Sequence, residues 1–116
     1  MAIDKGLIGG STVLLLLSLL ERKDYYGYEI IREIDKRSDN VFRYKEGTLY
    51  PVLHRMEAGG LLKSYQAETE GGKSRKYYKI TAKGKRQLES EKQQWNVFKN
   101  SVEQVLGSVG CGYAGV

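Results

Sequence analysis

The longest run of apolar residues along the chain predicts a central helix. Between Val13 and Leu20 only Ser18 is polar, and Ser11 just before the run is a suitable N-cap residue. A helix from Ser11 to about Arg22 would be apolar on nearly every side, which is typical of a helix in the middle of a domain. The first ten residues are rich in glycine, so we expect the chain to be irregular there.

A second helix is predicted from about Tyr26 to Lys36, where isoleucines recur at helical spacing. Asp24 precedes this helix and is a suitable cap. The positions expected to face inward are Ile31, Ile34, Tyr28 or Gly27, and Ile30 as a further candidate. The polar residues from Ser38 to Asn40 then indicate a turn.

A third helix is predicted in the segment KEGTLYPVLHRMEAGGLL, from Lys45 to Leu62. Its apolar residues have the i, i+3, i+4, i+7 spacing of a buried helix face: Leu49, Val52, Leu53 and Met56. Pro51 lies inside this pattern, and a proline in a helix interior usually breaks the helix. We therefore expect Thr48 to be the N-cap, which places Pro51 in the first turn, where a missing N–H matters little. Gly59 and Gly60 are expected to end the helix.

Two short alternating runs, Leu62–Tyr65 and Lys76–Ile80, predict a β-hairpin because a polar, glycine-containing loop separates them. Tyr78 and Ile80 lie two residues apart in the second run, so we expect them to share a buried face. Thr81 is a suitable cap for a long helix that follows.

This last helix is predicted from about Ala82 to Leu106, and it carries an apolar row that resembles a heptad seam. The row is interrupted once by Glu91 and is too short to stand alone as a coiled coil, but it is adequate as a dimerisation helix on a folded domain. Packing against the core of its own chain is the alternative. The expected dimer interface consists of Leu88, Trp95, Phe98, Val102, Val105 and Leu106.

The predicted order is helix, helix, helix, strand, strand, helix, and the first five elements are those of a winged helix-turn-helix. The fold class is therefore mainly α with a small β-hairpin, a winged helix-turn-helix plus a long C-terminal dimerisation helix. Residues 1–81 would form the winged helix-turn-helix domain, residues 82–107 the dimerisation helix, and residues 108–116 a flexible, glycine-rich tail.

The composition narrows the range of functions. A chain of 116 residues with 41% apolar residues forms one domain with a modest core, for which help from a partner chain would be unsurprising. The apolar run is far shorter than the roughly 20 residues that span a bilayer, and no signal peptide is evident. The single cysteine, Cys111, excludes an internal disulfide and fits a reducing cytoplasm. One cysteine and one histidine cannot supply the usual metal ligands, and paired carboxylates and nucleophilic triads are absent, so we expect neither a cofactor nor enzymatic activity.

The net charge of +5 is concentrated in one segment. From Gly71 to Arg86 the chain reads GGKSRKYYKITAKGKR, with seven basic residues and no acidic one. The other 100 residues hold 12 basic and 14 acidic groups, a net charge of −2. A local basic segment with interleaved aromatics indicates a surface that meets a polyanion. A solvated strand edge is the alternative, because lysines also discourage edge-to-edge aggregation.

The second helix of a helix-turn-helix enters the DNA major groove, with its N-terminal residues nearest the bases. Arg55 is suited to a bidentate guanine contact or a phosphate contact, and Thr48 and the hydroxyl of Tyr50 are suited to phosphates. His54 is either a DNA contact or an ordinary exposed residue. The full set of expected DNA contacts is Lys45, Thr48, Tyr50, Pro51, His54, Arg55, Lys73, Ser74, Arg75 and Lys76.

Three segments together resemble the signature blocks of the PadR family of transcriptional regulators: Tyr26–Ile30, Glu46–Leu62 and Gly71–Lys85. The resemblance covers about residues 10–106. It implies a winged-helix homodimer on a palindromic operator, and most characterised members repress until a small molecule releases them. The chain length resembles the subgroup with a single C-terminal dimerisation helix.

The resemblance also implies an effector site. In some multidrug-responsive members a tryptophan of the last helix stacks on aromatic ligands at the dimer interface, and Trp95 falls at the matching position. Leu14 and Ser18 match positions of the first helix that line the same pore. Lys99 departs from the acidic residue expected for a cation-binding member, which favours neutral or anionic planar aromatics. Interface packing alone is the alternative role for Trp95.

Two functions follow from this sequence. The first is a dimeric, sequence-specific DNA-binding repressor that a small planar aromatic effector releases at the dimer interface. The second is a winged-helix module for protein or RNA interaction without a ligand response. They differ at the helix from Thr48, because a DNA reader needs that helix exposed and needs a dimer.

Overall fold

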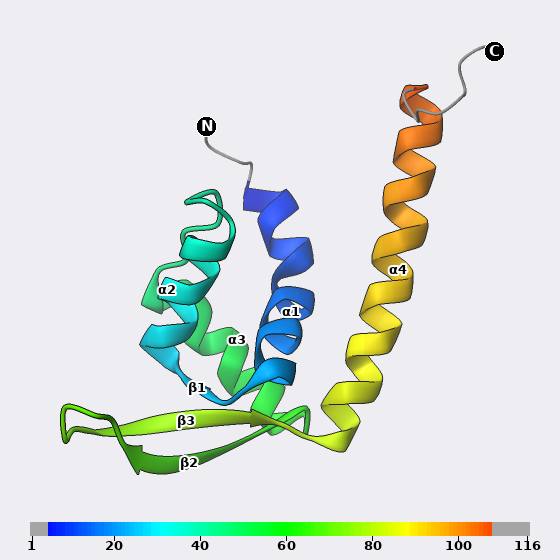
Figure 1. Ribbon diagram of the computed structural model, residues 1–116. Coiled ribbons are helices and arrows are strands. Elements are labelled where there is room, and N and C mark those ends of the chain that lie inside the picture. The colour runs from blue at the N-terminus through cyan, green and yellow to red at the C-terminus, as the bar shows by residue number, and fades with distance from the viewer. Residues whose placement is uncertain (1–4, 108–116) are drawn as a thin grey trace.

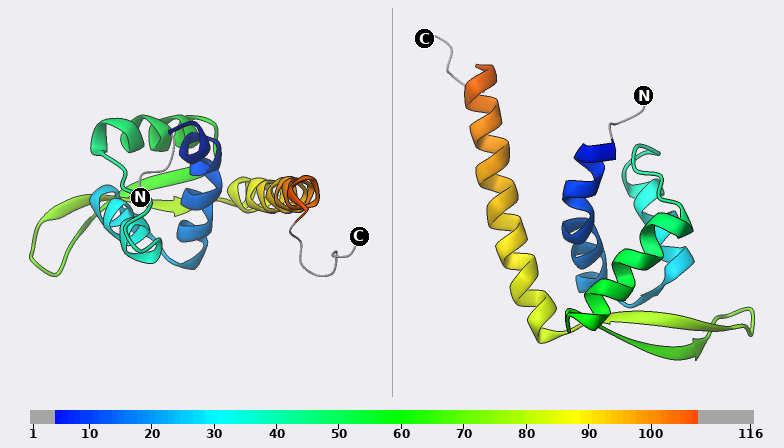
Figure 2. Two further views of the ribbon diagram at one scale, coloured as in Figure 1. Left: turned by 90° about the horizontal axis from the view of Figure 1, so that it is seen from above. Right: turned by 180° about the vertical axis from the view of Figure 1, so that it is seen from behind.

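The computed structural model describes residues 5–107 and shows four helices with one small antiparallel sheet (Figure 1). In chain order the elements are α1 (Lys5–Arg22), β1 (Tyr25–Tyr26), α2 (Gly27–Arg37), α3 (Glu46–Ala58), β2 (Leu62–Glu68), β3 (Ser74–Ile80) and α4 (Ala82–Leu106). The predicted fold class, mainly helical with a winged helix-turn-helix, is confirmed. Helices α1, α2 and α3 stand together on one side of the sheet, and the β2–β3 hairpin extends beyond them as the wing (Figures 1 and 2).

The sheet has three strands in the order β1-β3-β2, and all its pairs are antiparallel. The two-residue strand β1 was not predicted, because two residues are too few to show an alternating pattern. It pairs Tyr25 with Tyr78 and Tyr26 with Tyr77. The hairpin strands are longer than predicted, since the ladder continues from Leu62 opposite Ile80 to Glu68 opposite Ser74.

One hydrophobic core lies between the three clustered helices and the inner face of the sheet. Tyr78 and Ile80 are buried in it, as predicted. Thr12 and Tyr44 add a buried polar contact, because their hydroxyl oxygens lie 2.9 Å apart and each satisfies the other. The completely or almost completely buried side chains are Leu16, Leu17, Leu20, Ile30, Leu49, Leu53, Leu62 and Leu88.

The prediction for the start of α1 was wrong. The helix begins at Lys5, so the glycine-rich segment is helical and Ser11 is an interior residue rather than the N-cap. Each glycine in a helix interior is unfavourable by about 1 kcal/mol relative to alanine. Burial of one leucine such as Leu16 is worth about 1.5–3 kcal/mol, so a helix anchored by its buried leucines can continue through the glycines.

The predicted cap and inward face of α2 also need correction. Tyr26 is the N-cap residue, and its N–H donates to the Glu29 carboxylate at 3.2 Å. Asp24 instead accepts a hydrogen bond from the Tyr65 hydroxyl of β2. Ile30 and Ile34 are buried and Ile31 is partly buried against the core, as predicted, whereas Tyr28 is exposed.

Helix α3 begins earlier than predicted. Lys45 is the N-cap residue, and its carbonyl accepts the N–H groups of Thr48 and Leu49. Thr48 is therefore inside the helix, and Pro51 is an interior residue rather than part of the first turn. The lost hydrogen bond and the crowding by the ring cost about 3 kcal/mol in an isolated helix. The complete burial of Leu49 and Leu53 is large enough to offset that cost.

Helix α4 was predicted correctly from Ala82 to Leu106. The Thr81 hydroxyl accepts the N–H of Gly84 at 3.0 Å, which caps the first turn. Gly107 ends the helix in the left-handed conformation that glycine adopts without strain, with φ of 78°. The expected tail and Cys111 lie outside the described residues. Within residues 5–107 no helix is long and apolar enough to cross a membrane.

Candidate nucleic-acid interface

The outer side of α3 is free of the core, as a groove-reading helix requires. The buried residues Leu49, Leu53 and Met56 hold its inner side against the core, and Val52 is partly buried beside them. The opposite side is exposed and carries four of the residues predicted to contact DNA: Thr48, Pro51, His54 and Arg55. A fifth, Lys45, is exposed at the N-cap position just before the helix.

Tyr50 differs from its prediction because it is half-buried rather than exposed. Its ring lies directly over Gly27 at the start of α2, where an added Cβ would come within 2.7 Å of the Tyr50 Cε1. Burial, together with the neighbouring Glu46 carboxylate, raises the pKa of the Tyr50 hydroxyl to about 12. The hydroxyl therefore remains protonated and able to donate at physiological pH.

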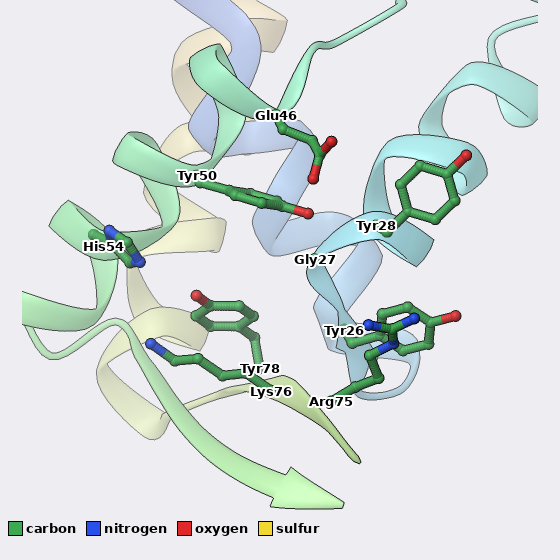
Figure 3. A pocket seen from close by; sticks show the side chains of 9 residues that line it. All are labelled: Tyr26, Gly27, Tyr28, Glu46, Tyr50, His54, Arg75, Lys76 and Tyr78. Carbon is green, nitrogen blue, oxygen red and sulfur yellow. The ribbon is translucent and has the colours of Figure 1, made fainter. Parts of the chain in front are cut away.

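Tyr50 faces a hollow of about 380 Å³ between α3, the start of α2 and strand β3 (Figure 3). The hollow combines aromatic rings with charges of both signs. It brings the predicted contacts His54, Arg75 and Lys76 together from two elements. Its full lining is Tyr26, Gly27, Tyr28, Glu46, Tyr50, His54, Arg75, Lys76 and Tyr78.

Two of the cations that line the hollow are held by aromatic rings. The Arg75 guanidinium lies over the Tyr26 ring at 5.7 Å, and the Lys76 ammonium lies 5.3 Å from the centre of the Tyr78 ring. Lys76 also lies 3.3 Å from the Glu57 carboxylate. Lys76 is half-buried and ion-paired, whereas Lys73 at the wing tip is exposed.

The tip of the wing presents three of the predicted DNA contacts to solvent. Lys73, Ser74 and Arg75 are exposed next to the Gly71–Gly72 turn, and Gly72 has the positive φ of 82° that favours glycine. The basic segment does not act as one surface, however. Lys83 at its other end donates to the Gly59 carbonyl at 2.8 Å and so ties α4 to the end of α3.

Sequence reasoning missed the acidic and aromatic part of this surface. Glu46 and Tyr28 were not among the expected contacts, although both lie within the segments that carry the family resemblance. The signal available was the YGYEI segment, Tyr26–Ile30. Tyr28 of this segment was expected to face the core, and Tyr26 was given no role in DNA binding.

The predicted dimer residues separate into two groups. Leu88 is completely buried in its own chain, so the prediction that it meets a second chain was wrong. The other five are exposed on the later part of α4. The Trp95 and Phe98 rings lie 6.2 Å apart. The five are Trp95, Phe98, Val102, Val105 and Leu106.

The four predicted effector residues lie on two different helices. Leu14 and Ser18 are half-buried on α1, and Trp95 and Lys99 are exposed on α4. Ser18 lines a different hollow of about 260 Å³, beside Ile34 of α2 and the following turn. Among residues 5–107 there is also no group of side chains that could hold a metal ion.

Comparison with known proteins gives consistent matches. The model of the transcriptional regulator PadR-like family matches residues 16–90. A PadR family transcription regulator from Clostridium difficile has a solved structure with 43% sequence identity, and the match covers 84% of this chain and 99% of that one, with a TM-score of 0.74. A transcriptional regulator from Clostridium thermocellum is 34% identical, with 89% and 97% covered and a TM-score of 0.81. Transcriptional regulator Rv3488 of Mycobacterium tuberculosis is 32% identical over 84 residues, which is 72% of each chain.

Proposed function

The chain belongs to the PadR-like family of transcriptional regulators, and we propose that it acts as a homodimer on a two-fold-symmetric DNA operator. Residues 1–81 would bind DNA and residues 82–107 would dimerise. The observation that carries the proposal is that the exposed side of α3 and the exposed cations of the wing belong to one winged helix-turn-helix. The family and its relatives are regulators rather than enzymes.

The alternative, an interaction module for protein or RNA, would use the basic wing but would need neither an exposed α3 nor a dimer. Two features favour DNA. The outer side of α3 is exposed and polar, and a family of transcriptional regulators matches the segment that contains it. The exposed apolar side of α4 supplies a surface for the second protomer. Half-sites would then lie about one helical turn, roughly 34–36 Å, apart.

We further propose that the protein represses transcription and that a small planar aromatic molecule releases it. The support is the exposed pair of rings, Trp95 and Phe98, on the side of α4 where a second protomer would pack. A dimer would place both pairs near one axis and could enclose Leu14 and Ser18 of α1 as well. Lys99, one turn after Trp95, would favour a neutral or anionic effector.

Operator binding should depend steeply on salt. With about six phosphates neutralised per dimer, the affinity is expected to fall by about 10³ between 50 and 200 mM salt. A mobility-shift titration against the upstream region of the gene measures this at two salt concentrations. No preference for that region over random duplex would contradict the proposed function.

The wing cations can be tested by one matched pair of variants. Lys73→Gln should reduce the salt slope by about one unit per protomer bound, because one phosphate contact is lost. Lys85→Gln removes the same charge from the same basic segment, but at the start of α4, the opposite end of the sheet from the wing tip (Figure 1). The Lys85 variant should retain the slope of the unmodified protein.

Trp95 is the only tryptophan, so its fluorescence reports directly on the proposed effector site. A planar aromatic molecule that releases the protein from DNA is expected to quench this fluorescence with the same concentration dependence as release. The measurement is a fluorescence titration beside a mobility-shift titration. A releasing molecule that leaves the emission unchanged would place the effector elsewhere.

A further inference from the structure

Helix α3 contains two residues that are unfavourable in a helix, one turn apart on its exposed side. They are Gly47 and Pro51, and both are solvent-exposed. Residues four apart in a helix are neighbours on one side. Alanine at either position would make the helix more stable, so the presence of both glycine and proline on its exposed side calls for a physical reason.

The packing of this chain gives no reason for glycine at position 47. An added Cβ there would meet nothing within 4 Å, and the backbone does not have the positive φ that favours glycine. Two other glycines of the chain are different: a Cβ at Gly27 would approach the Tyr50 ring to 2.7 Å, and one at Gly84 would approach the Leu61 carbonyl oxygen to 2.3 Å. These two are required by the fold, whereas Gly47 is not.

Pro51 removes the usual hydrogen-bond donor to the backbone at the same point. In an α-helix the N–H of residue 51 would donate to the carbonyl of residue 47. Proline has no N–H, so it cannot make that bond to the Gly47 carbonyl. The exposed side of α3 therefore has, at Gly47, both a missing side chain and a carbonyl without its usual intrahelical donor.

We propose that Gly47 is where the backbone of α3 itself lies against DNA, with its carbonyl accepting a hydrogen bond from a base in the major groove. The donors available there are the amino groups of cytosine and adenine. Close approach of a backbone to a ligand is one of the few needs that only glycine meets. This inference rests on the proposed function, since it requires α3 to enter the groove.

The test compares two glycine-to-alanine variants. Gly47→Ala should raise the melting temperature, because alanine favours a helix. It should also lower operator affinity about tenfold, because the added methyl group holds the α3 backbone away from the base. Gly10→Ala is the matched control: Gly10 is also helical and exposed, and an added Cβ there meets nothing within 4 Å. It should raise the melting temperature and leave operator affinity unchanged.

A second measurement identifies the donor and does not depend on the stability of a variant. Operators are made in which one cytosine at a time is replaced by 2-pyrimidinone, or one adenine by purine, so that the amino group is deleted. One position per half-site should weaken the unmodified protein, and the same deletion should leave the Gly47→Ala variant unaffected. Pro51→Ala, which restores an N–H donor to the Gly47 carbonyl, should also lose sensitivity at that position.

The outcomes separate this inference from the proposed function. If the unmodified protein does not prefer its operator over random duplex, the proposed function fails. If it does prefer the operator but Gly47→Ala binds equally well, the backbone contact is wrong and the proposed function stands. If Gly47→Ala lowers operator affinity but every amino deletion affects the unmodified protein and the Gly47→Ala variant equally, the proposed contact of the Gly47 carbonyl is wrong.

Discussion

Gly84→Ala is expected to destabilise the protein by about 2 kcal/mol, although it removes a glycine from a helix. Gly84 is buried in the first turn of α4. A Cβ there would lie 2.3 Å from the Leu61 carbonyl oxygen and 2.8 Å from the Ile80 Cγ1. The first neighbour is backbone, so α4 must move away from the end of the sheet. Overpacking of this kind costs about 1–3 kcal/mol or more, whereas the gain in helix propensity is about 1 kcal/mol.

Urea denaturation followed by circular dichroism measures this effect as a change in the free energy of unfolding. Gly9→Ala is a suitable control, because Gly9 is an exposed helical residue of α1 where a Cβ meets nothing within 4 Å. The control should be slightly stabilised. An unchanged or higher stability of Gly84→Ala would mean that α4 does not pack against Leu61 as described.

Local signals in the sequence were sufficient for α4 and for the presence of the hairpin, but not for the full length of its strands. Thr81 is followed by a long segment without proline, so both the cap and the start of the helix could be read directly. Tyr78 and Ile80 are buried as their two-residue spacing indicated. These features depend on neighbouring residues only, which is why the sequence was enough.

The starts of α1 and α3 could not be read in the same way. In both, a local rule about glycine or proline was overcome by burial of side chains farther along the helix. Leu49 and Leu53 hold α3 in place although Pro51 cannot donate a backbone hydrogen bond. The energy of that burial depends on the tertiary partners, which the sequence does not display.

The candidate site also depends on tertiary contacts that the sequence does not display. The exposure of Thr48 and Arg55 followed from helical spacing, but the position of Tyr50 did not. Its ring lies over α2 because Gly27 has no side chain there, and this contact joins residues 23 positions apart in the chain. A hollow between α2, α3 and β3 therefore emerges only when the three elements are placed together (Figure 3).

Leu88 illustrates why a heptad pattern alone does not identify a dimer interface. The same spacing serves a helix that packs on its own chain and one that packs on a partner. Helix α4 does the first near its start, where Leu88 is buried and Lys92 lies 3.7 Å from Glu21 of α1. Its later residues do not pack in the core, and Trp95 and Phe98 are exposed.

The double substitution Phe98→Asp and Val102→Asp is expected to make the protein monomeric and to lower operator affinity by about 100-fold or more. Phe98 is 57% and Val102 38% exposed in the single chain, so neither side chain is needed for the core. In a dimer the variant would bury two carboxylates per chain in an apolar contact, which is strongly unfavourable. Linkage of two half-site contacts multiplies affinity by about 10²–10⁴, so a monomer should lose most of it.

Analytical ultracentrifugation gives the oligomeric state, and a mobility-shift titration gives the affinity for the operator and for a single half-site. Val97→Asp is the control, because Val97 is 66% exposed but lies about 100° around the helix from Phe98. It should remain a dimer with full affinity. A double variant that stays dimeric would show that this side of α4 is not the interface. A monomeric double variant with unchanged operator affinity would instead contradict the two-fold operator, because each half-site would then bind without help from the other.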